Sequence, residues 1–512
     1  MHKSHFSRRT FLKTAAAGAS GSLLTGITLE KSSASEPARQ INSGDFTKMS
    51  IAEAADLIRR RKVSPVELTK ACLARIKRLN PHLNCFITVT EDTALAQAKE
   101  AESEILRGSW RGPLHGIPVA LKDLFDTAGV KTTAGSALFK DRIPTEDAEV
   151  VRRLKGAGAV LLGKTNMVEF AYGSNSAVSY FGAVNNPWDL AAIAGGSSSG
   201  SGAAVAAGLC FGALGSDTAG SVRIPAAICG IVGLKPTYGL VSNRGVVPLS
   251  WSLDHVGSMT RTVSDNALLL QVIAGYDPAE ATSIRVPIPN YNAGLGKRTS
   301  ALRVGVPREF FFENLDPEVE AAIMNALSVL RRLSAGLRDV VLPSTPEQQE
   351  SIRSAVRAAE AYSYHFESVN KTPDLYQPET LVRIRSGQDV TTRAYIQGRR
   401  DLAQARRAIE RAFENVDVLV TPTITAPPPN TAEMNKDLES STRLNGINIH
   451  NTSPFNVWGI PTISVPCGFT RKAMPIGLQI SGPNGSEAVV LQLAQAYEQA
   501  TDWHTRAPEV KA

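Results

Sequence analysis

Cysteine is scarce in this 512-residue chain, which holds five cysteines and no CxxC pair. So few thiols, spread over the whole chain, cannot build the dense disulfide framework of a small secreted domain. No histidine cluster accompanies them, so the sequence gives no zinc or redox site. We expect free, buried thiols at Cys72, Cys85, Cys210, Cys229 and Cys467.

Long apolar runs are missing as well. After the first 34 residues no stretch of 18 or more uncharged apolar residues occurs, so no membrane-spanning helix is predicted there. Residues 1–34 hold five basic residues and one acidic residue, so without them the formal charge of +7 falls to +3. This small excess gives no electrostatic case for nucleic-acid binding.

The N-terminus carries an export pattern. Arg8-Arg9 is followed by Phe-Leu-Lys and then by the mildly apolar, Ala- and Gly-rich residues 14–29. A twin arginine before a weak hydrophobic region is typical of a twin-arginine signal peptide, whereas a disordered basic tail would explain neither feature. We expect cleavage after Ala34, the export machinery as a partner, and a periplasmic or secreted mature protein of residues 35–512.

Helical and strand patterns alternate along the rest of the chain. Ser50 and Ser64 each begin a capping box, S-x-x-E, at the start of an amphipathic helix. Further helices are predicted at residues 91–107, 149–156, 203–208, 317–333, 351–367 and 486–501, and strands at 117–121, 159–162, 301–306 and 417–422. This alternation is typical of an α/β fold with a mixed, largely parallel central sheet flanked by helices.

Residues 195–223 contain two clusters of small residues, which predict two backbone-rich loops around a short buried helix. The first cluster, residues 195–202, is too poor in side chains to be a strand or ordinary core. In the second, residues 216–223, a serine hydroxyl follows successive backbone amides with little side chain over them. That arrangement suits a nucleophile beside an oxyanion hole, because the donors must lie about 3 Å from the developing charge. Asp217 and Arg223 are placed to brace this loop as an ion pair.

These motifs resemble the signature of the amidase signature family of serine hydrolases. Ser197 and Ser221 stand 24 residues apart, as in that family, and Gly-Ile-Pro-Val-Ala-Leu-Lys-Asp at residues 116–123 matches its lysine segment. The resemblance implies a Ser, cis-Ser, Lys triad with Ser221 as nucleophile, Ser197 as bridging serine and Lys122 as base. It also implies backbone oxyanion donors at Thr218, Ala219 and Gly220, support from Asp217, Arg223 and Ser198, and no metal or organic cofactor.

The physical chemistry of the residues agrees with these roles. Lys122 ends the apolar run 117–121, so burial should disfavour its charged form and lower its pKa toward neutral pH. A neutral lysine can accept a proton, and a second hydroxyl can relay it from the nucleophile. The glycine before the bridging serine, Gly196, relieves crowding at the cis peptide that the family has there.

Three competing interpretations are weaker. Residues 158–165 match the phosphate-loop pattern GxxxxGK[ST], but their centre is strand material rather than an open turn. Residues 196–200 match the nucleophile elbow GxSxG around Ser198, but Asp254 and His255 are adjacent and poorly placed as separate triad members. Lys235 is a second candidate base, although an ion pair or a surface position is favoured for it.

The resemblance spans residues 45–504 and is densest between 112 and 261. It predicts one amidase signature domain, with a catalytic core at about 45–281 and 415–505 and a region at about 282–442 that caps the substrate site and sets specificity. Residues 430–444 are expected to form a polar loop over the site. Four aromatic residues either line a pocket or pack within helices: Tyr362, Tyr364, Phe366 and Tyr395.

The predicted activity is hydrolysis of a small-molecule amide to an acid and ammonia or an amine, by a monomer or homodimer. An esterase or carbamate hydrolase on the same triad stays open. A glutamyl- or aspartyl-tRNA amidotransferase A-type subunit is opposed by the export pattern, and a noncatalytic binding protein by the intact triad. Ala219, Ala192 and Ala194 depart from the family's usual glycine, arginine and proline.

Overall fold

A computed structural model describes residues 46, 49–344 and 346–510, and the predicted signal peptide, residues 1–34, lies outside them. One mixed sheet of eleven strands runs through these residues, in the order β1-β3-β2-β4-β6-β5-β10-β11-β9-β7-β8. The strands are β1 (Phe86–Val89), β2 (Pro118–Lys122), β3 (Val160–Thr165), β4 (Gly212–Asp217), β5 (Val232–Lys235), β6 (His255–Thr260), β7 (Val304–Val306), β8 (Leu337–Asp339), β9 (Val418–Pro422), β10 (Thr462–Phe469) and β11 (Pro475–Ser481).

The predicted α/β class with a mixed central sheet is confirmed. Parallel pairs form two groups, β3-β2-β4 and β9-β7-β8. The strands between these groups pair antiparallel, so antiparallel pairing is more extensive than the sequence indicated. Because β2 and β4 are parallel neighbours, their carboxyl ends, Lys122 and Asp217, point to the same edge of the sheet.

Helices cover both faces of the central strands, whose residues in β2, β4, β5 and β6 are all buried. One group of packed helices is α5 (Ser199–Ala206) with α6 (Arg223–Cys229), and another is α7 (Val263–Ile273), α8 (Pro317–Leu333) and α15 (Glu487–Gln499). The remaining helices are α1 (Ile51–Arg59), α2 (Pro65–Leu83), α3 (Glu91–Leu106), α4 (Glu149–Gly156), α9 (Pro346–Lys371), α10 (Pro378–Arg385), α11 (Thr392–Ala408), α12 (Thr431–Met434), α13 (Leu438–Ile449) and α14 (Pro454–Trp458).

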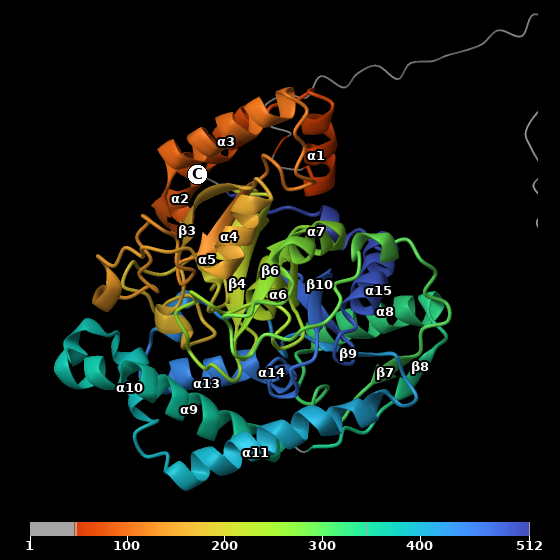
Figure 1. Cartoon of the computed structure of the whole chain (residues 1–512). Coiled ribbons are helices and arrows are strands. Elements are labelled where there is room, and N and C mark those ends of the chain that lie inside the picture. Colours follow the sequence, from red (N-terminus) through yellow and green to blue (C-terminus); the bar gives the residue numbers. More distant parts are fainter. Residues whose placement is uncertain (1–45, 47–48, 345, 511–512) are drawn as a thin grey trace, which may run out of the picture. The chain divides into compact units, whose positions relative to one another are not determined.

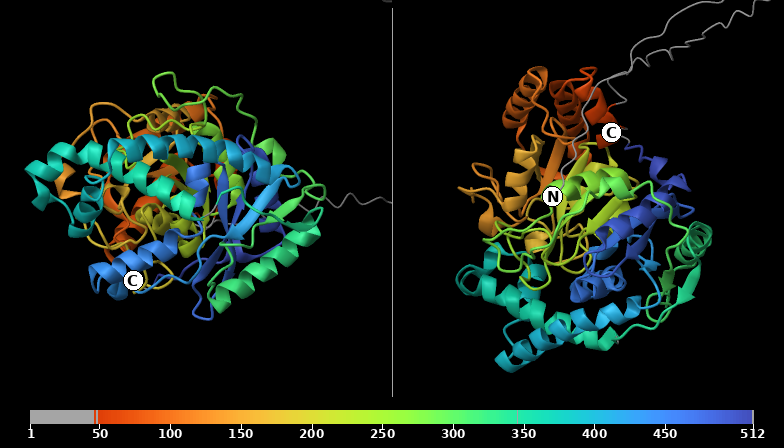
Figure 2. Two further views of the ribbon diagram at one scale, coloured as in Figure 1. Left: turned by 90° about the horizontal axis from the view of Figure 1, so that it is seen from below. Right: turned by 45° about the vertical axis from the view of Figure 1, so that its right-hand side comes forward.

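Residues 282–442 contribute both to the sheet and to a helical layer. Strands β7, β8 and β9 of this region extend the sheet beyond β11. The long helices α9 and α11 run side by side, as Figures 1 and 2 show in teal and cyan, and α10 and α14 contact α9. Helices α9, α10 and α11 of this layer thus follow β8 and precede β9 in the sequence. The role of the layer as a specificity cap stays a prediction.

Local sequence signals predicted several helix boundaries correctly. Ser50 and Ser64 each accept a bond from the backbone of the glutamate three residues later, and that glutamate bonds back, so both capping boxes are present. Helices α4 and α8 have the predicted bounds.

The prediction of a polar loop at residues 430–444 is wrong. That stretch contains α12 and most of α13, because the side chains of Asn430 and Asp437 accept bonds from Ala432 N and Ser440 N and cap both helices.

The five cysteines are buried and free, as expected. Burial raises the pKa of the Cys72 and Cys85 thiols to about 12, so neither is a reactive thiolate. No helix in the described part of the chain is long and apolar enough to cross a membrane.

Candidate active site

Lys122 lies at the carboxyl end of β2 with a fully buried side chain. Its Nζ donates to Ser197 Oγ at 2.7 Å and to Ser216 Oγ at 2.8 Å. Burial lowers the pKa of Lys122 from its ordinary value to about 7, against the opposing pull of the Asp254 and Asp217 carboxylates. A substantial fraction of Lys122 is therefore neutral at physiological pH and able to accept a proton.

Ser197 follows a cis peptide bond from Gly196, the geometry implied by the family resemblance. A Cβ on Gly196 would lie 1.9 Å from the carbonyl oxygen of Asn175, so no side chain fits at this position. Ser197 itself is fully buried, and its carbonyl accepts the amide of Val168 at 3.2 Å. The bridging hydroxyl is thus held in one place, with the Lys122 amine as its donor.

Ser221 stands in the loop that joins β4 to α6, and 7% of its surface is exposed. Its hydroxyl has no hydrogen-bond partner among the residues that the structure describes. Its carbonyl accepts the amide of Ser198 at 3.2 Å, which ties this loop to the one that carries Ser197. The structure therefore brings Lys122, Ser197 and Ser221 into one buried region and leaves the Ser221 hydroxyl available.

The backbone amides before Ser221 differ in their bonding. Gly220 N donates to Asp217 Oδ1 at 2.8 Å. Within the described residues the amides of Thr218, Ala219 and Ser221 have no acceptor. The left-handed φ of this loop, +127°, falls on Gly220, so the alanine at position 219 needs no unusual conformation. Three amides are thus free for an oxyanion, and Gly220 is the exception among the predicted donors.

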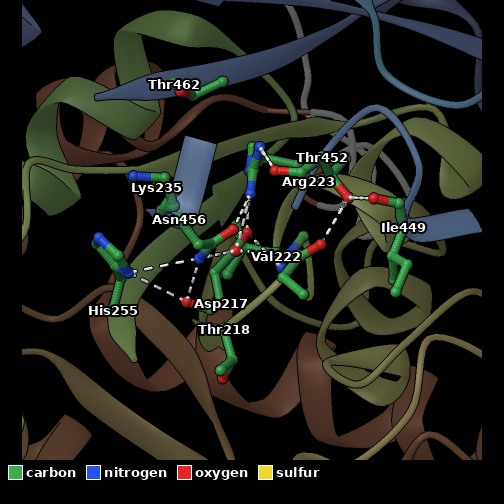
Figure 3. A network of polar contacts seen from close by, with 12 residues as sticks. Asp217, Thr218, Val222, Arg223, Lys235, His255, Ile449, Thr452, Asn456 and Thr462 are labelled. Atoms are coloured by element: carbon green, nitrogen blue, oxygen red, sulfur yellow. Dashed lines mark hydrogen bonds and ion pairs between the residues drawn. The ribbon is translucent and has the colours of Figure 1, made fainter. Parts of the chain in front are cut away.

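Asp217 and Arg223 form the predicted ion pair, and both side chains are fully buried (Figure 3). Arg223 Nε lies 3.1 Å from Asp217 Oδ2, and Nη2 lies 3.0 Å from Oδ1. Its remaining N–H groups donate to Thr452 O, Gln479 Oε1 and Asn456 Oδ1. Burial alone would raise the pKa of Asp217, but Arg223 holds it well below its usual range. The pair therefore stays charged and fixes both ends of the Ser221 loop.

Replacing Arg223 by methionine should lower the free energy of unfolding by about 3–5 kcal/mol, because it leaves the Asp217 carboxylate buried without its partner. The matched control is Arg303→Met, which breaks a partly exposed pair with Asp417 and should cost much less, because solvent screens an exposed ion pair. Urea denaturation of both variants measures the difference. Equal losses would show that the buried pair does not brace the fold.

Two further side chains belong to the site, Ser216 and Asp254, and neither was predicted in the role that it has there. Ser216 is the second acceptor for Lys122 Nζ. Asp254 Oδ1 accepts the Thr218 hydroxyl at 2.5 Å, and its Oδ2 accepts the amides of Leu249 and Ser250. Burial raises the pKa of Asp254 to about 6. Ser216 was part of the small-residue cluster, but no local signal separates it from its neighbours.

The competing interpretations are not supported. Residues 160–165 are strand β3, and Lys164 Nζ donates to Phe125 O and Thr132 Oγ1, so the GxxxxGK[ST] pattern is not a phosphate loop. Ser198 is fully buried and its hydroxyl donates to Ser216 O, which removes it as a nucleophile.

The prediction that Lys235 lies at the surface or in an ion pair is wrong. Its side chain is fully buried on β5 and donates to Ile460 O at 2.6 Å and Pro236 O at 3.1 Å. Burial lowers its pKa well below the ordinary value. Antiparallel pairing of β5 with β10 covers the strand, and this pairing could not be read from the local sequence.

In the described part of the chain, no group of three or more His, Cys, Asp or Glu side chains is arranged to hold a metal ion. The groups gathered at the site are the Lys122 amine, the hydroxyls of Ser197, Ser216 and Ser221, and backbone amides.

A sequence model of the amidase family matches residues 67–491. The chain is 42% identical over 485 residues to the A-type subunit of a glutamyl-tRNA(Gln) amidotransferase from Methylococcus capsulatus, covering 90% of this chain and 99% of that protein. It is 41% identical over 468 residues to an amidase from Pseudomonas putida, covering 91% and 98%. The solved structure of 6-aminohexanoate cyclic dimer hydrolase with its substrate superposes with a TM-score of 0.83 at 32% identity, covering 91% and 99%. The chain therefore belongs to the amidase family, hydrolases that cleave the carbon–nitrogen bond of amides.

Proposed function

We propose that the protein hydrolyses a carboxylic amide to an acid and ammonia or an amine through an acyl-enzyme on Ser221. The observation that carries this proposal is the 2.7 Å contact between Lys122 Nζ and Ser197 Oγ in a buried site. That contact joins a base of lowered pKa to a hydroxyl on the loop packed against Ser221. A serine hydroxyl needs such a positioned base to become a nucleophile.

In the acylation step neutral Lys122 accepts the proton of Ser197 as Ser197 accepts that of Ser221. The Ser221 oxygen then forms a bond to the carbonyl carbon, and the carbonyl electron pair moves onto its oxygen. The amides of Thr218, Ala219 and Ser221 receive that oxyanion. Gly220 is left out of this set because its amide donates to Asp217.

Collapse of the intermediate breaks the carbon–nitrogen bond. Ser197 delivers its proton to the departing nitrogen and regains one from Lys122, so ammonia or an amine leaves as a neutral molecule. Water then enters, gives its proton through Ser197 to Lys122, and its hydroxyl attacks the ester carbon. The bond between the carbonyl carbon and the Ser221 oxygen then breaks, and Ser221 regains a proton from Lys122 through Ser197 as the acid leaves. No external reductant, oxidant or cofactor is consumed.

A panel of substrates tests this function. Purified residues 35–512 are incubated with primary aliphatic amides, anilides, carbamates and esters, and the acid and the amine or alcohol released are quantified. Turnover of at least one amide supports the proposal. Turnover of esters alone would make the protein an esterase. If no compound of the panel is hydrolysed, the proposed amidase activity is rejected for these substrate classes.

A second candidate is a glutamine-hydrolysing component of a tRNA amidotransferase, which the 42% identity to such a protein favours. The predicted export signal argues against it, because charged tRNA is a cytoplasmic substrate. Hydrolysis of L-glutamine only after the other components of such a complex are added would favour this candidate. Hydrolysis of simple amides by the chain alone would favour the amidase.

We also propose that the protein is exported and works as a periplasmic or secreted enzyme, from the Arg8-Arg9 pattern and the weak hydrophobic region after it. Fractionation of cells that express the full chain and its Arg8→Lys, Arg9→Lys variant checks this. Loss of the exported form in the variant supports the proposal, and retention of both forms inside the cell contradicts it.

A further inference from the structure

A cavity of about 340 Å³ has Asp254 in its wall, and the Asp254 carboxyl group also bonds to Thr218 in the loop before Ser221. Its walls come from four separate segments, around Asp126 and Arg142, residues 243–254, Glu280, and helix α9. Six of the lining side chains matter here: Arg142, Asn243, Trp251, Asp254, Glu280 and Tyr364. The volume suits a small organic group rather than a macromolecule.

Asp254 joins this cavity to the candidate active site. Asp254 is one of the residues that line the cavity, and its Oδ1 accepts the hydroxyl of Thr218 at 2.5 Å. The backbone amide of Thr218 is the first of the proposed oxyanion donors. A substrate group in the cavity would therefore lie one side chain away from the carbonyl that is attacked.

The polar walls of the cavity hold acceptors that no cationic side chain neutralises. Its one arginine is already neutralised, because Arg142 makes two bonds of 2.6 and 2.7 Å to the carboxylate of Asp126. Glu280 accepts only from Thr282 and has no cationic partner among the described residues. Asn243 Oδ1 is buried and unpartnered, while its Nδ2 donates to Asp254 O. The cavity thus has an uncompensated carboxylate and an unused carbonyl oxygen.

Two exposed aromatic rings complete the cavity. Trp251 is 47% exposed and Tyr364 is 37% exposed, and their ring centroids lie 6.3 Å apart in a T-shaped arrangement. Rings that pack only for stability are normally buried, whereas exposed tryptophan and tyrosine faces attract cations. Aromatic faces beside a carboxylate without a cationic partner are the features that recognise an ammonium group on an apolar stem.

We propose that this cavity binds the ammonium end of an amide substrate, so that the preferred substrates are amides that carry a primary amine at a distance from the carbonyl. This inference rests on the proposed amidase function and adds the substrate class to it. The ammonium group would donate to Glu280 and to Asn243 Oδ1 and lie against Trp251. The stem would run past Asp254 toward Ser221.

Three amides of equal length test the proposal: pentanamide, 5-aminopentanamide, and 5-amino-5-oxopentanoate, which are neutral, cationic and anionic. We expect kcat/KM in the order cationic, neutral, anionic, with about a tenfold step between the first two that appears mainly in KM. Glu280→Gln and Trp251→Ala should each remove most of that step, measured as the ratio of kcat/KM for 5-aminopentanamide to kcat/KM for pentanamide within the same variant. Glu320→Gln, which removes an exposed carboxylate of α8 outside the cavity, is the matched control and should retain the step.

Inhibition of pentanamide hydrolysis by pentylamine separates a substrate subsite from a distant site. Competitive inhibition that weakens in Glu280→Gln supports the proposal. Noncompetitive inhibition, or equal kcat/KM for the three amides, overturns it even if the amidase activity is present. A series of ω-amino amides with longer chains extends the comparison. If none of them is hydrolysed faster than the neutral amide of the same chain length, the proposal is overturned as well. Absence of all amide turnover would instead reject the proposed function itself.

Discussion

Replacing Ser221 by alanine is expected to lower kcat/KM for every amide substrate by roughly 10⁵- to 10⁶-fold. Activity falls by a similar factor when the nucleophilic serine of other hydrolases is replaced. The physical reason is that no other hydroxyl in the site can take its place. Ser197 is fully buried and bonded to Lys122 Nζ, and the Ser198 hydroxyl is directed to Ser216 O. Single-turnover and steady-state assays with the best amide of the panel measure the loss.

The alanine variant should fold normally, because the Ser221 hydroxyl has no partner among the described residues whose bond would be lost. Ser328→Ala on α8, where an exposed serine donates only to its own helix, is the control and should keep full activity. Mass spectrometry of the parent after rapid acid quenching should locate the acyl group on Ser221. Activity of the alanine variant within tenfold of the parent would remove Ser221 as the nucleophile.

Much of this site followed from local sequence. The apolar run before Lys122 predicted a buried strand that ends in a desolvated lysine, and β2 has that form. The small residues around Ser197 and Ser221 predicted two backbone-rich loops, which the structure places at either end of the α5-β4 unit. The predicted boundary of the first loop is wrong, because α5 begins at Ser199 rather than at Ala203. The spacing of Asp217 and Arg223 predicted their ion pair. In each case the determining features lie within a few residues of one another.

The unpredicted parts depend on which strands become neighbours. Ser216 reaches Lys122 because β2 and β4 pair with Leu121 opposite Leu214, a register that no local pattern specifies. The bonds that Arg223 donates to Asn456 Oδ1 and Gln479 Oε1 join segments more than 200 residues apart. Tyr364 lines a cavity whereas Tyr395 donates to Glu360, although both were read as aromatic positions on helices. Composition and periodicity carry no information about such long-range pairing.

Lys122 is the second position where a large effect is expected. Lys122→Met should lower kcat/KM by about 10⁴-fold, because the Ser221 proton then has no acceptor. Methionine keeps the length and apolar character of the lysine stem, so the buried space at the end of β2 stays filled. Retention of activity within tenfold of the parent would show that another group is the base.

The parent enzyme should also show the titration of this lysine. Only the neutral amine accepts a proton, and burial lowers its pKa to about 7, so kcat/KM for an uncharged amide should rise with pH and level off above about 7. Asp254 and Asp217 both raise that pKa, so Asp254→Asn should move the midpoint to lower pH by removing one of the two charges. A profile that is flat from pH 5 to 9 would exclude a titrating Lys122. An unchanged midpoint with a lower plateau in Asp254→Asn would show that the carboxylate acts on the rate by holding Thr218 rather than through its charge.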